Sequence, residues 1–207
     1  MNVSLIEVGK KYGAEWIFQN LSAELKNTQK WAITGPNGSG KSTLLKVISG
    51  HLSPNKGKVS FNGELYEKVA FCAPYIDLIE AFSPIEMLNF QRNFIPFIDN
   101  ISNTKIFDIL ELKFSQNKRI KDFSSGMKQR LKLGLSLLSE KKIILLDEPT
   151  TNLDLKSKDW YQSLIANFGN EKLIIVASNE ENDFSFCQNF IHIPDFKPKS
   201  SFQKFVQ

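Results

Sequence analysis

A glycine-rich stretch carries the clearest chemistry in this sequence. Residues 35–42 read G-P-N-G-S-G-K-S, which is the spacing of a phosphate-binding P-loop. Glycines allow the backbone to turn its N–H groups toward an anion, and the start of the following helix adds to the positive field. In such a loop the lysine, Lys41, reaches the β- and γ-phosphates, and the serine hydroxyl, Ser42, reaches Mg²⁺. The nucleotide-binding residues predicted from this stretch are Gly35, Pro36, Asn37, Gly38, Ser39, Gly40, Lys41, Ser42 and Thr43.

The neighbours of this loop distinguish a phosphate site from a glycine-rich turn that binds nothing. Residues 31–34, which precede it, are apolar and partly β-branched, as in a buried strand. Residues 44–48, which follow it, form the apolar face of a helix that should end near Gly50. Strand, glycine-rich loop and helix in this order are the context that a P-loop requires, so we favour the phosphate site.

Two adjacent carboxylates predict a metal ligand and a catalytic group. Residues 143–146 are four apolar residues in a row, which is typical of a central parallel strand that is buried on both faces. Asp147 and Glu148 follow at the C-terminal end of this strand, where α/β sheets bind their ligands. With a P-loop upstream, the pair predicts an Mg²⁺ carboxylate followed by a catalytic carboxylate. Surface charges that only end a strand are the alternative.

Apart from the P-loop and the helix that follows it, the segments before residue 74 predict strands. Residues 2–33 are interpreted as short antiparallel strands that lead into the P-loop strand. Residues 58–61 predict a hairpin strand that ends in a turn at Asn62-Gly63, and residues 69–73 predict another buried strand.

The middle of the chain predicts helices. Residues 78–122 are interpreted as a mostly helical insertion, and the helical subdomain as a whole is placed at about 78–135. Ser83, Pro84 and Glu86 form a capping box with proline at the first helical position, which predicts a helix through about residue 94. Further elements are expected as helices at 104–112, 123–138 and 159–168, a strand at 172–177, and a solvated tail from Pro194.

The helix expected from residue 123 opens with an unusual polar sequence. Residues 123–127 read F-S-S-G-M, and their hydroxyl and free N–H groups can meet an anion. Taken alone, this pattern favours a plain N-cap.

Composition limits the classes of function. The chain has 207 residues, which fits a single domain over 1–207, and a formal net charge of +4 from scattered lysines, so no nucleic-acid partner is expected. The sequence shows no signal peptide and no apolar run near the roughly 18 residues of a membrane span. Cys72 and Cys187 lack metal-type spacing, which favours free thiols in a reducing cytosol.

In their order along the chain, these motifs resemble those of ABC-type ATPases, the nucleotide-binding subunits of ABC transporters. The order is an aromatic residue, the P-loop, a signature, an acidic strand end and a D-loop. Here these are Tyr12, residues 35–42, residues 123–127, Asp147-Glu148 and residues 151–154. The resemblance implies an α/β fold with a P-loop NTPase core and mostly parallel sheet, an N-terminal antiparallel β subdomain and an inserted helical subdomain. It also implies that the ring of Tyr12 stacks on adenine.

The resemblance implies further residue roles. Lys41 and Glu148 would be catalytic, with Glu148 polarising the attacking water, and Ser42 and Asp147 would hold Mg²⁺. The signature would contact the γ-phosphate that a second subunit holds, and Asp154 would help to align the dimer. The signature residues are Ser124, Ser125, Gly126 and Met127.

The chain departs from the family pattern at a position that contacts Mg²⁺ and water, at one that contacts the γ-phosphate, and within the signature. The family usually has a glutamine after the strand at 69–73, where this chain has Pro74, which offers neither a side-chain acceptor nor an N–H. The family has a histidine after the strand at 172–177, where this chain has Asn179 as the switch residue. Asparagine donates a hydrogen bond but cannot carry a proton charge. Ser125 and Met127 replace a glycine and a glutamine of the signature.

By this resemblance the chain would be the ATP-binding and ATP-hydrolysing subunit that powers an ABC transporter through a separate membrane subunit. Its cofactors would be ATP and Mg²⁺. ATPase subunits would form a homodimer or heterodimer on ATP binding, at the cytoplasmic face of the cell membrane. Residues 75–82, apolar in a loop setting, would dock on the membrane subunit. The alternatives are a soluble ABC ATPase of assembly, repair or translation, and a slow or non-hydrolytic ATP-dependent interaction module.

Overall fold

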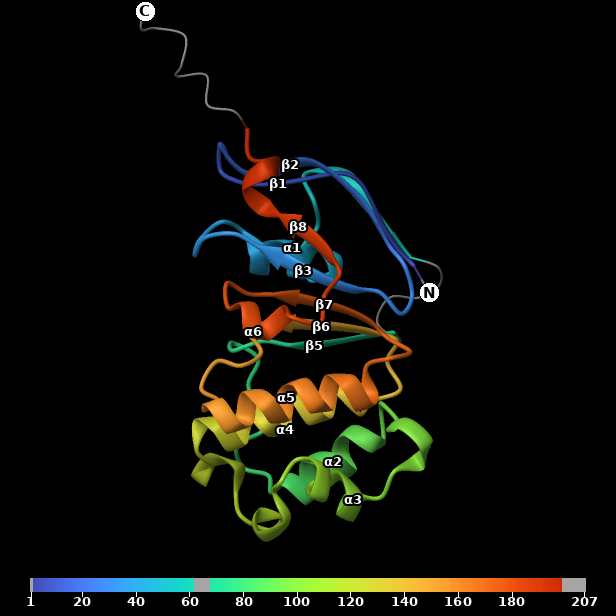
Figure 1. Ribbon diagram of the computed structural model, residues 1–207, viewed down its shortest axis with the longest axis vertical. Coiled ribbons are helices and arrows are strands. Elements are labelled where there is room, and N and C mark those ends of the chain that lie inside the picture. Colours follow the sequence, from blue (N-terminus) through green and yellow to red (C-terminus); the bar gives the residue numbers. More distant parts are fainter. Residues whose placement is uncertain (1, 62–67, 199–207) are drawn as a thin grey trace, which may run out of the picture.

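A five-stranded parallel sheet forms the centre of the molecule (Figure 1). The computed structural model describes residues 2–61 and 68–198. The order of strands across this sheet is β5-β6-β7-β3-β8, and every neighbouring pair is parallel. Their bounds are β3 (Lys30–Thr34), β5 (Val69–Cys72), β6 (Ile143–Asp147), β7 (Leu173–Ala177) and β8 (Asn189–His192). The predicted P-loop strand and acidic strand are therefore confirmed as β3 and β6.

The middle of this sheet is covered on both faces. Every residue of β6 and β7 is buried, and alternate residues point into two separate apolar cores. Ile144 and Leu146 pack with α4 (Ser125–Leu137) and α5 (Leu155–Phe168), whereas Ile143 and Leu145 pack with α1 (Lys41–Ile48). The uninterrupted apolar run of β6, residues 143–146, follows from this double burial, because neither face of the strand meets water.

An antiparallel sheet covers the α1 side of the molecule. Its order is β2-β1-β4, with β1 (Val3–Tyr12), β2 (Glu15–Leu25) and β4 (Lys56–Phe61). The expectation of short strands is wrong, because β1 and β2 are 10 and 11 residues long. Register shifts within β1 break the two-residue alternation of apolar side chains, so the long strands look like several short ones in the sequence. The turn expected at Asn62-Gly63 lies outside the described residues.

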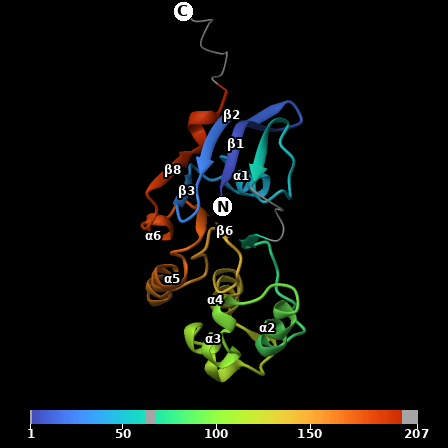
Figure 2. The same cartoon turned by 90° about the vertical axis from the view of Figure 1, so that its right-hand side faces the viewer.

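Helices gather at the opposite end of the molecule (Figure 2). They are α2 (Pro84–Arg92), α3 (Asn103–Ile109) and α4, joined by short 3₁₀ turns at Ile98–Asn100, Lys113–Ser115 and Ile120–Asp122. At the start of α2 the Ser83 N–H donates to Glu86 Oε2 at 2.7 Å, and the Ser83 hydroxyl accepts from the Glu86 N–H. The predicted capping box is therefore confirmed. Within the described ranges no helix has the length and apolar character needed to cross a membrane.

Two boundaries in the C-terminal third differ from the expectations. Helix α5 begins at Leu155 rather than at residue 159, because the Asp154 carboxylate accepts from the Ser157 N–H at 2.8 Å and caps the first turn. After α6 (Glu181–Phe184) and β8, the segment Ile193–Phe196 forms a 3₁₀ turn that packs on the apolar core, with Ile193 fully buried. Phe196 packs on this core past Pro194, but Asp195, Lys197 and Pro198 are exposed, and the remainder of the expected solvated end, 199–207, lies outside the described residues.

The Ser83 capping box gives a test of this fold. Ser83→Ala removes the side-chain acceptor at the start of α2, so the free energy of unfolding should fall by about 1 kcal/mol. Urea denaturation followed by circular dichroism measures this change. Ser163→Ala, an exposed serine inside α5, is the matched control and should be neutral or slightly stabilising. Equal stability of Ser83→Ala and wild type would contradict the assignment.

Candidate functional site

The P-loop connects the end of β3 to the start of α1. Gly40 is the N-cap residue of α1 with φ 113°, a left-handed conformation that disfavours side chains. A Cβ atom at Gly40 would also lie 2.2 Å from Ile17 Cγ2 on β2, so both the backbone and the available space require glycine there. The loop therefore presents its N–H groups and the start of α1 without an intervening side chain. Within it, the Ser39 hydroxyl is buried and has no hydrogen-bond partner among the described residues, as expected where a polar ligand is accommodated.

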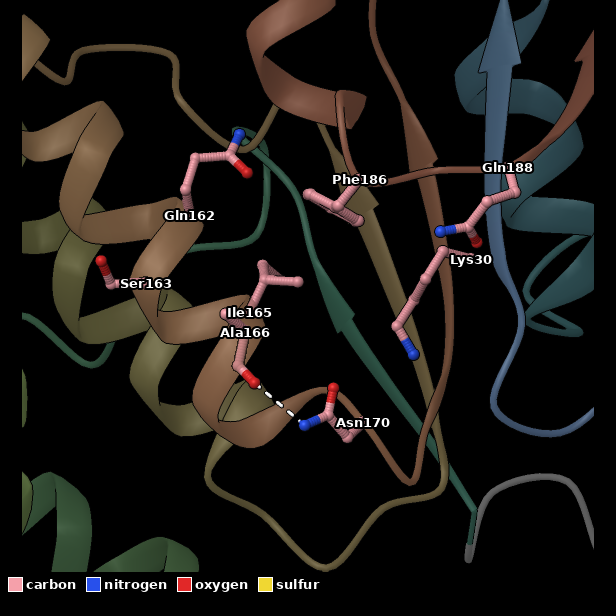
Figure 3. A pocket seen from close by; sticks show the side chains of 8 residues that line it. All are labelled: Lys30, Gln162, Ser163, Ile165, Ala166, Asn170, Phe186 and Gln188. Carbon is pink, nitrogen blue, oxygen red and sulfur yellow. Dashed lines mark hydrogen bonds between the residues drawn. The ribbon is translucent and has the colours of Figure 1, made fainter.

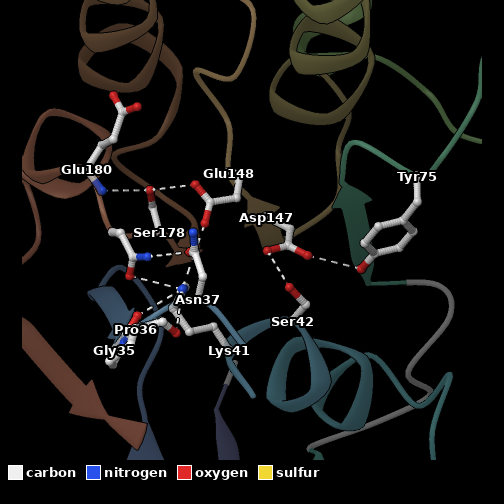
Figure 4. A network of polar contacts seen from close by, with 11 residues as sticks. Gly35, Pro36, Asn37, Lys41, Ser42, Tyr75, Asp147, Glu148, Ser178 and Glu180 are labelled. Atoms are coloured by element: carbon white, nitrogen blue, oxygen red, sulfur yellow. Dashed lines mark hydrogen bonds and ion pairs between the residues drawn. The ribbon is translucent and has the colours of Figure 1, made fainter. Parts of the chain in front are cut away.

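Lys41 lies at the bottom of this loop among acceptors (Figure 4). Its side chain is only 6% exposed, and its ammonium group donates to Gly35 O at 2.9 Å and to Asn179 Oδ1 at 3.0 Å. The Glu148 carboxylate lies 3.9 Å from the same ammonium. Asn179 also donates through Nδ2 to Asn37 Oδ1 at 2.6 Å. The residue predicted as the switch is thus in contact with both the lysine and the tip of the P-loop.

The Asp147 carboxylate accepts two hydroxyl groups. Ser42 Oγ donates to Asp147 Oδ1 at 3.0 Å, and Tyr75 Oη donates to Asp147 Oδ2 at 3.2 Å. Burial raises the pKa of Asp147 above its ordinary value, and the hydrogen bonds from Ser42 and Tyr75 oppose that rise. Serine and carboxylate oxygens are the hard ligands that Mg²⁺ prefers. In the part of the chain that the structure describes, no cluster of three or more His, Cys, Asp or Glu side chains could hold a metal. One carboxylate and one hydroxyl fit Mg²⁺ that is carried with phosphates, which would supply further oxygen ligands.

Glu148 adopts an uncommon backbone conformation next to Asp147. Its φ is 46°, in the left-handed region that non-glycine residues seldom occupy, and such strain is concentrated at functional sites. Its Oε2 accepts from the Ser178 hydroxyl at 3.0 Å, and its N–H donates to Ala177 O at 2.9 Å. Burial raises the pKa of Glu148, while the Ser178 hydrogen bond and the Lys41 ammonium act in the opposite direction.

Lys41, Ser42 and Glu148 border one cleft with a volume of about 430 Å³. Tyr12 and Ile17 line its outer part, and the ring of Tyr12 is 54% exposed with the Lys10 ammonium 5.7 Å from its centroid. An exposed aromatic face at the rim of a phosphate loop can stack on a flat ring. The full lining is Tyr12, Ile17, Asn37, Gly38, Gly40, Lys41, Ser42, Thr43 and Glu148.

The signature residues lie in a different cleft. Ser124 is the N-cap of α4 and its hydroxyl accepts from the Met127 N–H at 3.2 Å, while Ser125 is exposed. Gly126 lies against the D-loop, since a Cβ atom there would be 3.2 Å from Asn152 O. This second cleft, also of about 430 Å³, contains Asp154 and shares no lining residue with the P-loop cleft. A single chain therefore does not bring its signature to its own Lys41.

Sequence reasoning missed two hydroxyl groups of the site. Tyr75 was predicted only as part of a docking segment, and Ser178 only as the neighbour of Asn179. Each contacts one of the two carboxylates, Asp147 and Glu148 respectively. Ser178 follows the strand next to β6, so its position at a parallel strand end was a usable signal. Tyr75 offered no comparable signal, because its contact depends on how the loop after β5 folds back.

A third depression, of about 450 Å³, lies at the opposite edge of the parallel sheet (Figure 3). Its charged residue, Lys30, donates to the oxygen of Gly169, the C-cap of α5, at 2.7 Å and to Lys172 O, just before β7, at 2.9 Å. Burial lowers the pKa of Lys30. These bonds satisfy carbonyl groups at a helix end, which is a structural role, so we exclude this depression as the reaction site.

Comparisons with known proteins agree with this geometry. The chain is 31% identical over 199 residues to the lantibiotic transport ATP-binding protein SrtF of Streptococcus pyogenes, covering 90% of this chain and 81% of that protein. Among solved structures, an ATP-binding subunit of an ABC transporter aligns with a TM-score of 0.80 at 20% identity, over 93% of this chain and 85% of that one. The bacterial ABC transporter cassette MJ0796, in a dimeric structure, aligns with a TM-score of 0.79 at 25% identity, over 92% and 93%. MJ0796 has also been solved as a dimer in a post-hydrolysis state, bound to ADP and Pi.

The model of the ABC transporter family matches residues 18–151, which span the P-loop, the signature and the acidic end of β6. The parallel sheet, the antiparallel β sheet and the order of motifs agree with that match. This chain belongs to the ABC transporter family, with the fold of its ATP-binding cassettes.

Proposed function

We propose that this chain binds ATP with Mg²⁺ in the P-loop cleft and hydrolyses it to power a transporter whose membrane subunit is a separate polypeptide. The observation that carries the proposal is the convergence of Lys41, Ser42, Asp147 and Glu148 at one end of the parallel sheet. The similarity to a transport ATP-binding protein supports the transport role.

The P-loop cleft has groups that could bind both the phosphates and the base of a nucleotide. The N–H groups of the loop and the Lys41 ammonium would hold the β- and γ-phosphates, and Tyr12 would stack on the adenine. The Lys41 ammonium already donates hydrogen bonds to Gly35 O and Asn179 Oδ1, so it is oriented before a phosphate binds. Asn179 would offer its amide N–H₂ to the γ-phosphate in place of Asn37.

The two carboxylates would have different tasks. Ser42 and Asp147 would hold Mg²⁺, which when bound neutralises charge that develops on the phosphates. Glu148 would accept a hydrogen bond from the attacking water and orient it in line with the γ-phosphate. Ser178 keeps Glu148 pointed toward Lys41, and the raised pKa makes its carboxylate a stronger acceptor than an exposed one.

A second ATPase subunit, identical or related, would complete each site. The hydroxyl of Ser125 and the start of α4 are open to solvent, and the cleft around them holds no phosphate-binding lysine of its own among its lining residues. Ser124, Ser125, Gly126 and Met127 would therefore contact the γ-phosphate that the other subunit holds, with Asp154 beside them.

The loop of residues 75–82 would dock on the membrane subunit, which places the ATPase at the inner face of the cell membrane. Tyr75 and Ile79 are 48% and 38% exposed, although they are large and apolar, and Phe82 packs edge to face on Phe90. Exposed apolar side chains grouped on one loop are typical of an interaction surface.

A slow or non-hydrolytic ATP-dependent module is the second candidate. The observation that favours it is Asn179, a neutral amide at the position where proton charge would help the γ-phosphate to leave. Steady-state phosphate release by the wild-type chain distinguishes the two candidates. Turnover that stays at the background level with and without membranes containing the transporter would favour the module.

Lys41→Ala tests the phosphate site. The change removes the buried cation, so affinity for ATP should fall by about two orders of magnitude and binding should disappear at micromolar nucleotide. Titration of a fluorescent ATP analogue measures it. Lys58→Ala, an exposed lysine of β4, is the matched control and should bind as wild type does. Unchanged affinity in Lys41→Ala would rule out this loop as the phosphate site.

Glu148→Gln tests the electrostatic cost of the catalytic carboxylate in the nucleotide-free chain. Below pH 4.5 the carboxyl is protonated both in the folded and in the unfolded chain, but above its raised folded pKa the fold holds a partly desolvated charge. The amide avoids this cost, so Glu148→Gln should have a higher Tm than wild type at pH 8, and the difference should shrink as the pH falls toward 4.5. Differential scanning calorimetry measures both. Glu171→Gln, whose side chain is 89% exposed, should show no such trend.

The same variant tests the dimer. With Mg²⁺ and ATP, Glu148→Gln keeps binding but lacks the group that polarises water, so a long-lived dimer should accumulate while nucleotide lasts. Sedimentation velocity with ATP, with ADP and without nucleotide measures the mass. The double variant Glu148→Gln/Ser125→Glu places a negative charge against the partner's γ-phosphate and should stay monomeric. A monomeric Glu148→Gln at saturating ATP would contradict the arrangement in trans.

A further inference from the structure

Tyr75 connects the surface of the molecule to the buried carboxylate of Asp147. Its hydroxyl lies 3.2 Å from Asp147 Oδ2, across 72 positions of sequence, while the Asp147 side chain is only 1% exposed. The Tyr75 residue itself is 48% exposed. The ring of Tyr75 is therefore partly open to solvent, while its hydroxyl reaches a buried carboxylate.

The ring is held in this direction from two sides. The Lys46 ammonium of α1 lies 4.1 Å from the centroid of the ring, and Phe71 at the end of β5 meets it edge to face at 6.2 Å. Pro74 precedes Tyr75 and has a fixed φ, which limits how the loop leaves β5. The contact with Asp147 is thus supported by α1, by β5 and by the loop itself.

The two oxygens of Asp147 have separate partners. Oδ1 accepts from Ser42, the other predicted metal ligand, and Oδ2 accepts from Tyr75 on the far side of the carboxylate. The two oxygens of a carboxylate move together, so a hydrogen bond to one of them restricts the direction of the other. The Tyr75 hydrogen bond to Oδ2 therefore restricts the direction of Oδ1, which faces Ser42 (Figure 4).

We propose that Tyr75 is a positioning residue of the metal site: its hydroxyl holds Asp147 in the orientation that binds a divalent cation together with Ser42. The inference rests on the proposed function, because it needs a nucleotide-bound cation at Asp147. Tyr75 does not touch the reacting phosphates; it acts through Asp147. In this chain the Tyr75 hydroxyl, on the loop after β5, donates the hydrogen bond that holds Asp147. The preceding residue, Pro74, has no side-chain donor or acceptor that could do so.

Tyr75→Phe in the full chain tests this role, because it keeps the ring against Lys46 and Phe71 and removes only the hydroxyl. The affinity for Mn²⁺, a paramagnetic substitute for Mg²⁺, is measured by electron paramagnetic resonance in the presence of a non-hydrolysable ATP analogue. Loss of a hydrogen bond to a ligating carboxylate should weaken Mn²⁺ binding about 10-fold. The affinity of the same variant for the analogue in EDTA, without metal, should stay within about twofold of wild type, because Lys41 and the P-loop are untouched.

Tyr161→Phe is the matched control. It also removes a tyrosine hydroxyl, one that donates to the backbone oxygen of Asp183 at 3.0 Å rather than to Asp147, and it should leave Mn²⁺ affinity unchanged. Mn²⁺ affinity of Tyr75→Phe equal to wild type, or an equal loss in both variants, would overturn the role of Tyr75. An equal loss of metal-free analogue binding in Tyr75→Phe would also overturn it, since the defect would then not be specific to the cation. If wild type itself binds no Mn²⁺ with the analogue, the proposed function fails and the inference fails with it.

Discussion

The candidate site depends on the parallel register of three neighbouring strands. Ala177 at the end of β7 is paired with Asp147 on one side and with Ile33 on the other, so β6, β7 and β3 end at the same level. The residues that follow these ends are Glu148, Ser178-Asn179 and the P-loop, and they contact one another at one edge of the sheet. A shift of one residue in either pairing would turn the side chains at these strand ends to the opposite face.

Several buried or half-buried charges meet at this edge of the sheet. Asp147 and Lys41 are almost completely buried, and Glu148 is partly buried in a left-handed backbone conformation. Each is held by hydrogen bonds from neighbouring elements: Ser42 and Tyr75 to Asp147, Ser178 to Glu148, and Lys41 to Gly35 and Asn179. A polar network that is satisfied in this way stays rigid, whereas an unpaired charge in the same place would destabilise the fold. The raised pKa values of Asp147 and Glu148 show that burial still outweighs these bonds.

The separation of the two clefts links the fold to assembly. In one chain the helix that begins at Ser125 carries its exposed hydroxyl groups away from the P-loop, so each cleft has only part of what a triphosphate requires. A second subunit that docks in the opposite direction would supply the missing part, and nucleotide would then bridge two protein surfaces. Both apolar cores are built from residues of one chain, so in this arrangement the partner would complete the site rather than the core.

Contiguous motifs explain why much of the site was predictable from the sequence. The P-loop, the apolar run of β6 with its acidic end, and the capping box at Ser83 each lie within a few residues, and their chemistry is local. The parallel strand and helix that flank the P-loop follow from the same short-range patterns. The sequence by itself therefore determined the family resemblance, the α/β fold class and which residue types face a nucleotide.

Tertiary structure alone decided the contacts between segments that are distant in the chain. The hydroxyl of Tyr75 meets Asp147 only because β5 pairs with β6 and the following loop folds back over that edge, and no periodicity in the sequence encodes this approach. Likewise, the register shifts of β1 occur where it pairs with β2 and with β4, and they break the alternation of apolar residues from which a strand is predicted. Asn179 was located by its place after a strand, but its bonds to Lys41 and Asn37 required the register of β7 against β3. The chemistry of a short motif depends on neighbouring residues, whereas the geometry of a site depends on how the strands pair.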